Sequence, residues 1–294
     1  MLERFGRKRF GSVVCPNCGR LVGVNDAQCL NCGRRNPGLW GFAPALRKWG
    51  VNMRFDQIVL VTCVVLFTAT LLVDPGAVGA GGVMSLLSPS QFAKFLFGAS
   101  GAAPIYGYHR WWTVLSAGVL HGSLLHIAFN MMFLRQIGPQ ISEYYGPSRA
   151  FLIFSLASVA GFLLTSTVGA FLPLPGLFSG AVGLTVGASA GLFGLTGALV
   201  YYGRRTGMTA VSQQAWGWAV AVFLLGFVSF GGRGSNTDNW AHLGGYLGGW
   251  LAARWLDPLR QERGDHHLLA LAMLVATVAA VVASLVTGWA FRPR

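Results

Sequence analysis

Seven long apolar segments between residues 57 and 290 constrain this chain more than any other feature of its sequence. They carry almost no charge, as membrane-spanning helices do, and a locally thinned bilayer accommodates those shorter than roughly 20 residues. The segments therefore predict a polytopic membrane protein of the all-α class. They are Gln57–Val73, Leu120–Ile137, Ala150–Leu172, Val186–Tyr202, Ala215–Phe230, Trp240–Trp255 and Leu268–Ala290.

Charged residues are scarce, and many of the positive ones gather before the first apolar segment. They make up only 11% of the 294 residues, against about 25% in soluble domains. The net charge is +13, and ten of the 22 Lys and Arg residues precede Gln57. Positive charge placed in this way sets the orientation of a membrane protein and touches anionic lipid, so no nucleic-acid partner is expected.

The remaining positive charges predict which side of the membrane each loop occupies. With the N-terminus in the cytoplasm, the loops after the fourth and sixth segments also lie inside, and they hold Arg204, Arg205, Arg254, Arg260 and Arg263. An excess of Lys and Arg on the cytoplasmic side is the general rule. We therefore expect an integral protein of the plasma (inner) membrane with its C-terminus outside.

Four of the five cysteines form two Cys-x-x-Cys pairs, made by Cys15, Cys18, Cys29 and Cys32. Each pair is followed by Gly-Arg, and the glycine lets the backbone turn around a metal ion. Four thiolates in tetrahedral array suit zinc as a structural ion, with rubredoxin-like iron as the chemical alternative. Two disulfides are the other alternative, which a reducing cytoplasm disfavours.

A segment of about 30 residues is too short to bury a core that would fold it, so the metal would supply the folding free energy. We therefore predict a small zinc-ribbon-like domain at about residues 13–37, within a basic cytoplasmic segment at residues 1–55. The sequence does not reveal what this domain binds.

Polar residues stand in the second, fourth and sixth apolar segments or at their borders, where hydrogen-bonding groups are costly and mark function by default. They are His121, His126, Asn130, Ser189, Asp238 and His242. Taken singly, each has an ordinary explanation. A serine in a membrane helix usually bonds its own backbone, and a histidine can serve a proton relay or a metal. Asp238 lies one turn before His242 and is most simply a helix N-cap.

Spacing indicates how these residues could meet. His126 and Asn130 are four residues apart, so they lie on one helix face, where both can donate hydrogen bonds to an oxyanion. Small residues recur every fourth position around Ser189 and His242, and such ridges let two helices approach closely. These ridges are Gly183, Gly187 and Gly191 on one segment, and Ala241, Gly245 and Gly249 on the other. Close approach would bring Ser189 within hydrogen-bond reach of His242, which activates a serine as nucleophile.

Together these motifs resemble the rhomboid family of intramembrane serine proteases over about residues 56–255. The family motifs His-x-x-x-Asn, Gly-x-Ser and Ala-His-x-x-Gly-x-x-x-Gly, with an upstream histidine and an aromatic residue after the serine, match His121, His126, Asn130, Gly187, Ser189, Phe193, Ala241, His242, Gly245 and Gly249. Two positions depart from the family pattern. Ala190 stands where glycine often follows the serine, and Trp112-Thr113 stands where the family has Trp-Arg.

The resemblance implies a six-helix core at residues 56–255, followed by a cytoplasmic loop and a seventh spanning helix at residues 256–294. It implies an endopeptidase that cleaves transmembrane segments of other proteins through a Ser189–His242 dyad and an acyl-enzyme, without a third acid. In the family the aromatic residue, here Phe193, packs on the catalytic histidine. The Ser189 backbone N–H, His126 and Asn130 would hold the oxyanion.

The same resemblance implies that catalysis needs no cofactor and that the partners are membrane-protein substrates and the lipid bilayer. The oligomeric state is left open. The alternatives are a catalytically silent rhomboid-like scaffold that binds membrane proteins, and a small transporter with a Ser/His relay. A transporter would carry paired carboxylates within its spans, whereas Asp and Glu here lie at ends and in loops. His266 and His267 are expected to be solvated loop residues.

Overall fold

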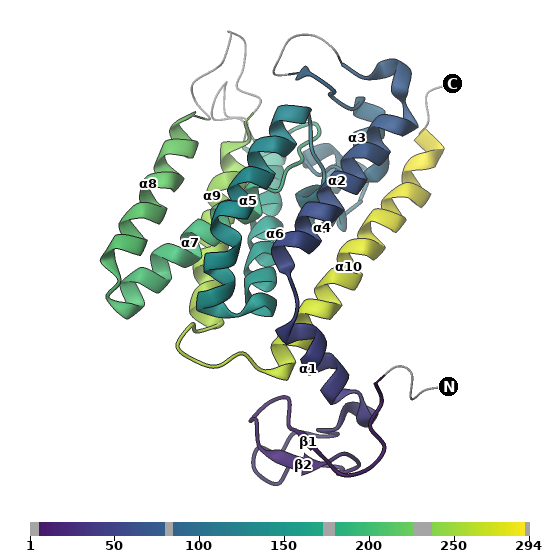
Figure 1. Ribbon diagram of the computed structural model, residues 1–294. Helices are drawn as coiled ribbons and strands as arrows, with labels where there is room; N and C mark the ends of the chain where they lie inside the picture. The colour runs from purple at the N-terminus through teal and green to yellow at the C-terminus, as the bar shows by residue number, and fades with distance from the viewer. Residues whose placement is uncertain (1–5, 80–84, 173–179, 226–236, 292–294) are drawn as a thin grey trace.

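The computed structural model describes residues 6–79, 85–172, 180–225 and 237–291, and it consists mainly of helices (Figure 1). A small two-stranded antiparallel sheet precedes them. The strands and main helices are β1 (Ser12–Val14), β2 (Leu21–Gly23), α1 (Ala43–Val51), α2 (Phe55–Val73), α3 (Gln91–Phe97), α4 (Thr113–Ser116), α5 (Leu124–Tyr145), α6 (Pro147–Phe171), α7 (Ser189–Thr206), α8 (Thr209–Leu225), α9 (Asn239–Trp255) and α10 (Gly264–Gly288).

Each predicted apolar segment contains a helix, although residues 226–230 of the fifth segment lie outside the described residues. Among the described residues, α2, α6 and α10 are long and apolar enough to cross a membrane. A fourth span is present if α5 is counted together with the short helices just before it, from which it is bent by 87°. The cysteine pairs and the sheet lie at one end of the molecule, below the helices in Figure 1. The predicted all-α membrane fold with a cysteine-rich N-terminal extension is confirmed.

Helix α9 packs directly against α7, and glycines make the close approach possible. A Cβ atom added to Gly245 would collide with the carbonyl oxygen of Ala190, and one added to Gly249 would collide with that of Gly194. The predicted small-residue ridge on α9 therefore lies where the two helix backbones touch, as is common for membrane helices with small residues at their interface.

The ridge predicted around Ser189 is wrong, because α7 begins at Ser189 and Gly183 and Gly187 precede it. Gly191 faces Phe154 of α6 instead of α9. Ala190, Gly194 and Gly197 of α7 are the small residues that lie against the backbone of α9. Where the helix begins determines which small residues share a face, and a recurrence of glycine does not reveal that position.

The N-terminal extension is fastened to the start of α10. Arg34 forms an ion pair with Asp265, and the Asp265 backbone N–H donates to the Pro16 carbonyl oxygen (3.3 Å). His266 and His267 are consequently buried, with 9% and 2% of their surfaces exposed, so the prediction that they are solvated loop residues is wrong. Helix α1 and the N-terminus of α6 cover this turn, where His267 Nδ1 lies 2.9 Å from Ser148 Oγ.

The long connection before the second predicted span is held against α10 by Arg110, which is fully buried. The Arg110 guanidinium donates to the carbonyl oxygens of Phe95 (2.9 Å) and Ser284 (2.8 Å), and the Trp112 indole N–H donates to Ser284 Oγ (3.0 Å). A buried guanidinium needs such acceptors. Arg110 thus ties this connection to α10, although the Trp-Arg dipeptide of the family is absent here.

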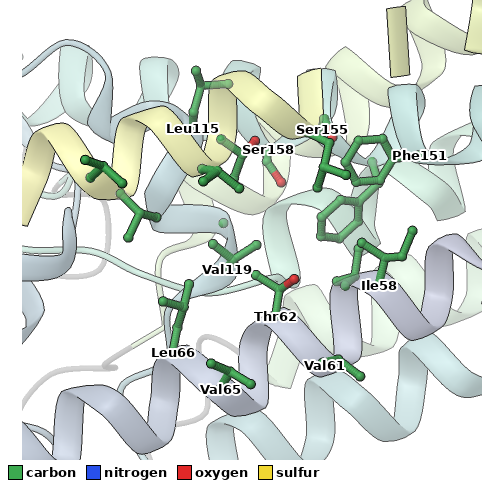
Figure 2. A pocket seen from close by; sticks show the side chains of 18 residues that line it. Ile58, Val61, Thr62, Val65, Leu66, Leu115, Val119, Phe151, Ser155 and Ser158 are labelled. Carbon is green, nitrogen blue, oxygen red and sulfur yellow. The ribbon is translucent and has the colours of Figure 1, made fainter. Parts of the chain in front are cut away.

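An apolar cavity of about 290 Å³ lies between α2, α4, α6 and α10 (Figure 2). Figure 2 shows Val61, Val65 and Leu66 of α2 on one side and Ser155 and Ser158 of α6 on another. Neither Ser189 nor His242 lines it. The cavity therefore belongs to the packing of the first and last apolar helices and is separate from the predicted catalytic pair.

Candidate active site and candidate metal centre

Ser189 and His242 are in direct contact, with 2.9 Å between Ser189 Oγ and His242 Nε2. Ser189 is the first residue of α7, and His242 lies in the first turn of α9. The Phe193 ring stacks on the His242 imidazole, with 4.2 Å between ring centroids and 14° between the planes. The contact of α7 with α9 holds the two helix ends together, and the stacked ring fixes the orientation of the imidazole.

No carboxylate completes a triad within the described residues. His242 Nδ1 is buried without a hydrogen-bond partner there. The Asp238 carboxylate accepts the backbone N–H of Ala241 (3.0 Å), so its predicted role as N-cap of α9 is confirmed. Its oxygens also accept hydrogen bonds from Thr165 and Thr185, which no sequence motif distinguishes. The geometry is that of a serine–histidine pair without a third acid.

His126 lies near Ser189, because both side chains lie within a few ångströms of the place where a Gly187 side chain would begin. Its Nδ1 atom accepts the Gly122 backbone N–H (3.3 Å), which leaves Nε2 as the protonated nitrogen and a hydrogen-bond donor. A Cβ atom added to Gly187 would lie 2.8 Å from His126 Nε2 and 3.4 Å from Ser189 Oγ. Gly187 also has φ +144°, which disfavours any other residue. Gly187 therefore keeps open the space between the donor and the serine, where an oxyanion would sit.

Asn130 and His121 contact His126, and neither forms a side-chain hydrogen bond with Ser189 among the described residues. The Asn130 side-chain amide donates to the His126 carbonyl oxygen (2.7 Å), one helical turn back on α5. His121 is buried with its ring 5.1 Å from the His126 ring, and both of its ring nitrogens lack partners among the described residues. The structure thus gathers Ser189, His242 and His126, and Asn130 and His121 both contact His126.

The backbone N–H of Ser189 is a further donor at this site. The first N–H groups of an α-helix have no acceptor within the helix, and Ser189 is the first residue of α7. A helix N-terminus also carries partial positive charge, which favours an anion nearby. The start of α7 at Ser189 therefore leaves free the backbone donor that the family resemblance implies there.

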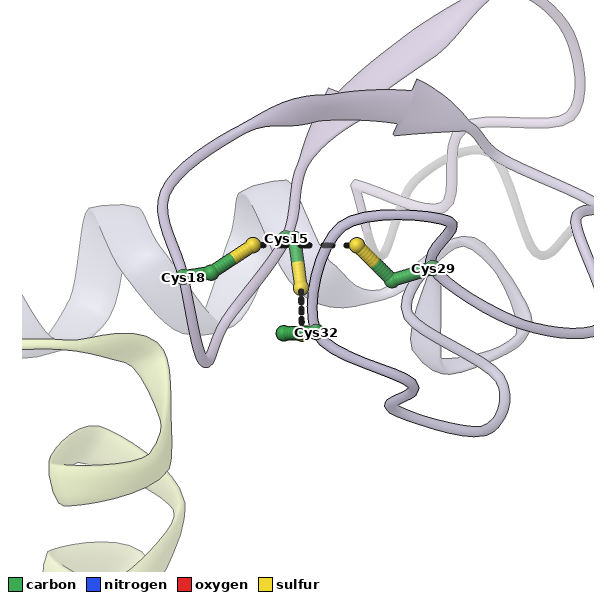
Figure 3. Close-up of side chains that lie close together, drawn as sticks. All are labelled: Cys15, Cys18, Cys29 and Cys32. Atoms are coloured by element: carbon green, nitrogen blue, oxygen red, sulfur yellow. Dashed lines mark hydrogen bonds between the residues drawn. The ribbon is translucent and has the colours of Figure 1, made fainter.

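The four paired cysteines of the N-terminal extension converge (Figure 3), where each contributes one sulfur and all four sulfurs lie within 4.8 Å of one another. The Sγ atoms of Cys15 and Cys32 are 3.7 Å apart, and those of Cys18 and Cys29 are 3.6 Å apart. Zn–S bonds of about 2.3 Å in a tetrahedron give sulfur–sulfur distances of about 3.8 Å. All four thiols are free of disulfides, so the residues present fit a four-thiolate metal site.

The two Cys-x-x-Cys turns have the same local geometry. The Gly19 N–H donates to the Cys15 carbonyl oxygen (3.0 Å), and the Gly33 N–H donates to that of Cys29 (2.9 Å). Both glycines have positive φ, at 74° and 73°. The Arg20 backbone N–H lowers the pKa of the Cys18 thiol to about 6, and metals bind the thiolate form. Burial raises the pKa of the Cys15 thiol to about 11, so the two turns bring the sulfurs together but favour the thiolate form only at Cys18.

The family model of the rhomboid domain matches residues 108–260, more than half of the chain. The chain is 31% identical over 167 residues to "Rhomboid protease GluP" of Bacillus subtilis (strain 168), which is 57% of this chain and 30% of that protein. It is 30% identical over 166 residues to "RHOMBOID-like protein 1" of Arabidopsis thaliana, which is 56% of this chain and 40% of that protein.

A third relative, "Inactive RHOMBOID-like protein 8" of Arabidopsis thaliana, is 24% identical over 170 residues, which is 55% of this chain and 43% of that protein. The chain thus spans less than half the length of these three relatives. The resemblance to the rhomboid family noted in the sequence is confirmed. The helices that are apolar and long enough to cross a membrane make the chain an integral membrane protein. The chain belongs to the rhomboid family.

Proposed function

We propose that this protein is an intramembrane serine endopeptidase in which Ser189 is the nucleophile and His242 is its base. The observation that carries the proposal is the 2.9 Å contact between Ser189 Oγ and His242 Nε2. A serine hydroxyl is a weak nucleophile until a neighbouring base takes its proton. His242 Nε2 accepts that proton while Ser189 Oγ attacks the scissile carbonyl carbon. His242 then donates the proton to the leaving amine, and water hydrolyses the acyl-enzyme with the same base.

The oxyanion of the tetrahedral intermediate lies between Ser189 and His126. In this proposal the Ser189 backbone N–H and His126 Nε2–H donate to it, and the missing side chain of Gly187 leaves room for it. The Asn130 side-chain amide donates one hydrogen to the His126 backbone carbonyl oxygen and has a second hydrogen to donate. Donors fixed in a site that excludes bulk water stabilise developing negative charge strongly.

In this proposal the substrates are transmembrane segments of other proteins, because α7 and α9, which carry Ser189 and His242, pack against α6, a helix apolar enough to cross a membrane. The backbone of a regular helix is fully hydrogen-bonded, so a cleavable segment should carry Gly, Pro or other helix-weakening residues near the scissile bond. The proposed orientation has the N-terminus in the cytoplasm and the C-terminus outside, in the plasma membrane. The proposed domains are residues 1–55, residues 56–255 and residues 256–294, with a structural zinc ion in the first and no cofactor in catalysis.

A catalytically silent scaffold is the second candidate, because one relative is named as inactive. Both Ser189 and His242 are present here and in contact, which favours an enzyme. The test is labelling of the purified protein with a serine-reactive fluorophosphonate, with a Ser189→Ala variant as control. We expect labelling of the wild type alone. Equal labelling of both proteins, or of neither, would contradict the proposed nucleophile.

Removal of an oxyanion donor should slow cleavage without abolishing it. A single lost donor at such a site typically lowers kcat by about 10²–10³-fold. We therefore expect His126→Ala and Asn130→Ala each to retain weak, measurable cleavage of a helical model substrate in detergent. Met132→Ala, an exposed position on the same helix, is the matched control and should cleave at the wild-type rate. Wild-type rates in both donor variants would place the oxyanion elsewhere.

A further inference from the structure

Asp238 joins three separate parts of the fold. Its Oδ1 atom accepts the Thr165 hydroxyl of α6 (2.7 Å) and the Ala241 backbone N–H of α9 (3.0 Å). Its Oδ2 atom accepts the Thr185 hydroxyl (2.8 Å) from the segment that leads into α7. An N-cap role explains only one of these three hydrogen bonds, so the two threonine contacts require another explanation.

Both threonines are themselves anchored. Thr165 Oγ1 accepts the Ala181 backbone N–H (3.0 Å), and Thr185 exchanges two backbone hydrogen bonds with Ser100 (2.8 and 3.0 Å). The Ala181 carbonyl oxygen in turn accepts the Ala102 N–H (2.8 Å). The segment from residue 181 to residue 185 is therefore held at both ends, and the Asp238 carboxylate connects it to α6 and α9.

The spacing along the chain relates this network to the catalytic pair. Thr185 precedes Ser189 by four residues, and Asp238 precedes His242 by four residues. The Thr185–Asp238 hydrogen bond and the Ser189–His242 contact therefore connect the same two stretches of chain at two points, four residues apart on each stretch. The His242 backbone N–H donates to the Asp238 carbonyl oxygen (3.1 Å), but the Asp238 carboxylate does not reach the imidazole, whose Nδ1 lacks a partner among the described residues.

We propose that Asp238 is a positioning residue that fixes the distance between Ser189 and His242 by tying the segment before α7 to the start of α9. The inference rests on the proposed function, in which these two residues react. The tie needs three hydrogen bonds at the side chain of residue 238 and does not need a negative charge in contact with His242. This requirement separates Asp238 from a third catalytic acid, which acts through its charge.

The test compares Asp238→Ala with Asp238→Asn by the rate of fluorophosphonate labelling and by kcat and KM for a helical model substrate. Misplacement of reacting groups by about 1 Å can cost about 100-fold in rate, so Asp238→Ala should lower the labelling rate and kcat by about 10- to 100-fold with KM unchanged. Asp238→Asn should stay within about threefold of the wild type, because its amide can accept the Ala241 N–H and donate to a threonine hydroxyl.

Three further variants distinguish positioning from general loss of stability. Thr185→Val removes one tie at nearly constant shape and should lower kcat in the same way, and Asp238→Ala with Thr185→Val should be no slower than Asp238→Ala alone. Ser90→Ala is the matched control, because Ser90 caps α3 by accepting the Ala93 N–H (3.0 Å) and has no tie to Ser189. It should lower thermal stability yet label at the wild-type rate.

Hydrogen exchange measures directly how firmly Asp238 holds the segment before α7, whether or not the protein cleaves a substrate or labels. The amides of residues 181–189 should exchange faster in Asp238→Ala than in the wild type or in Ser90→Ala. Unchanged exchange there, wild-type labelling by Asp238→Ala, or equal losses in Asp238→Asn and Asp238→Ala would overturn the inference. A wild type that does not label contradicts the proposed function instead, and the exchange measurement then still decides the tie.

Discussion

Ser189→Ala and His242→Ala should each lower kcat for cleavage of a helical membrane substrate by at least about 10³-fold, and the double variant should be no slower than either single variant. Ser189 Oγ and His242 Nε2 share one hydrogen bond, so they act as a unit and the loss of either removes the same step. The measurement is the initial rate of cleavage by each purified variant in the same detergent, with folding checked by circular dichroism.

The control for the serine variant is Ser158→Ala in α6. Ser158 is also buried within the helical bundle, but its hydroxyl has no hydrogen-bond partner in the described part of the chain. Its removal should leave kcat unchanged. Robust proteolysis by Ser189→Ala would refute the mechanism outright. A wild-type protein that cleaves nothing yet binds membrane helices would favour the scaffold.

Metal analysis of protein purified without added metal should find one zinc ion per chain, and Cys15→Ser with Cys29→Ser should remove it. Structural zinc contributes about 10–16 kcal/mol of apparent binding free energy in small domains, and this extension has few other buried apolar residues. The variant should therefore lose protease resistance and hydrogen-exchange protection between β1 and α1. Fluorophosphonate labelling should persist, because every proposed catalytic group lies beyond residue 120.

Cys63→Ala is the matched control, since Cys63 is buried in α2 far along the chain from the paired cysteines. Its metal content should equal that of the wild type. One iron ion in place of zinc would correct the identity of the metal and keep the site. The absence of both metals, or a disulfide among the four cysteines, would contradict the metal site.

Local sequence patterns were sufficient to predict most helices and the contents of the site. A membrane helix makes all its backbone hydrogen bonds within itself, and its lipid-facing side chains are apolar. Each span is therefore visible in the sequence as a long apolar segment. The N-cap at Asp238 and the two Cys-x-x-Cys turns are also local, because their hydrogen bonds join residues three or four apart. The prediction of Ser189 near His242 rested on two small-residue ridges, of which the one around Ser189 is wrong, and on the family resemblance, since a spacing of 53 residues carries no geometry by itself.

The sequence by itself thus determined the apolar helices, the family and the residue types available to the site. Only the tertiary structure decided which small residues of α7 meet α9, that His267 is buried against Ser148, and that Asp238 holds Thr165 and Thr185. His267 and Ser148 are 119 positions apart in the sequence, and Asp238 is 73 positions from Thr165 and 53 from Thr185. Burial and hydrogen-bond partners at such separations depend on how whole helices pack, and that packing is a property of the folded chain and not of any short stretch within it.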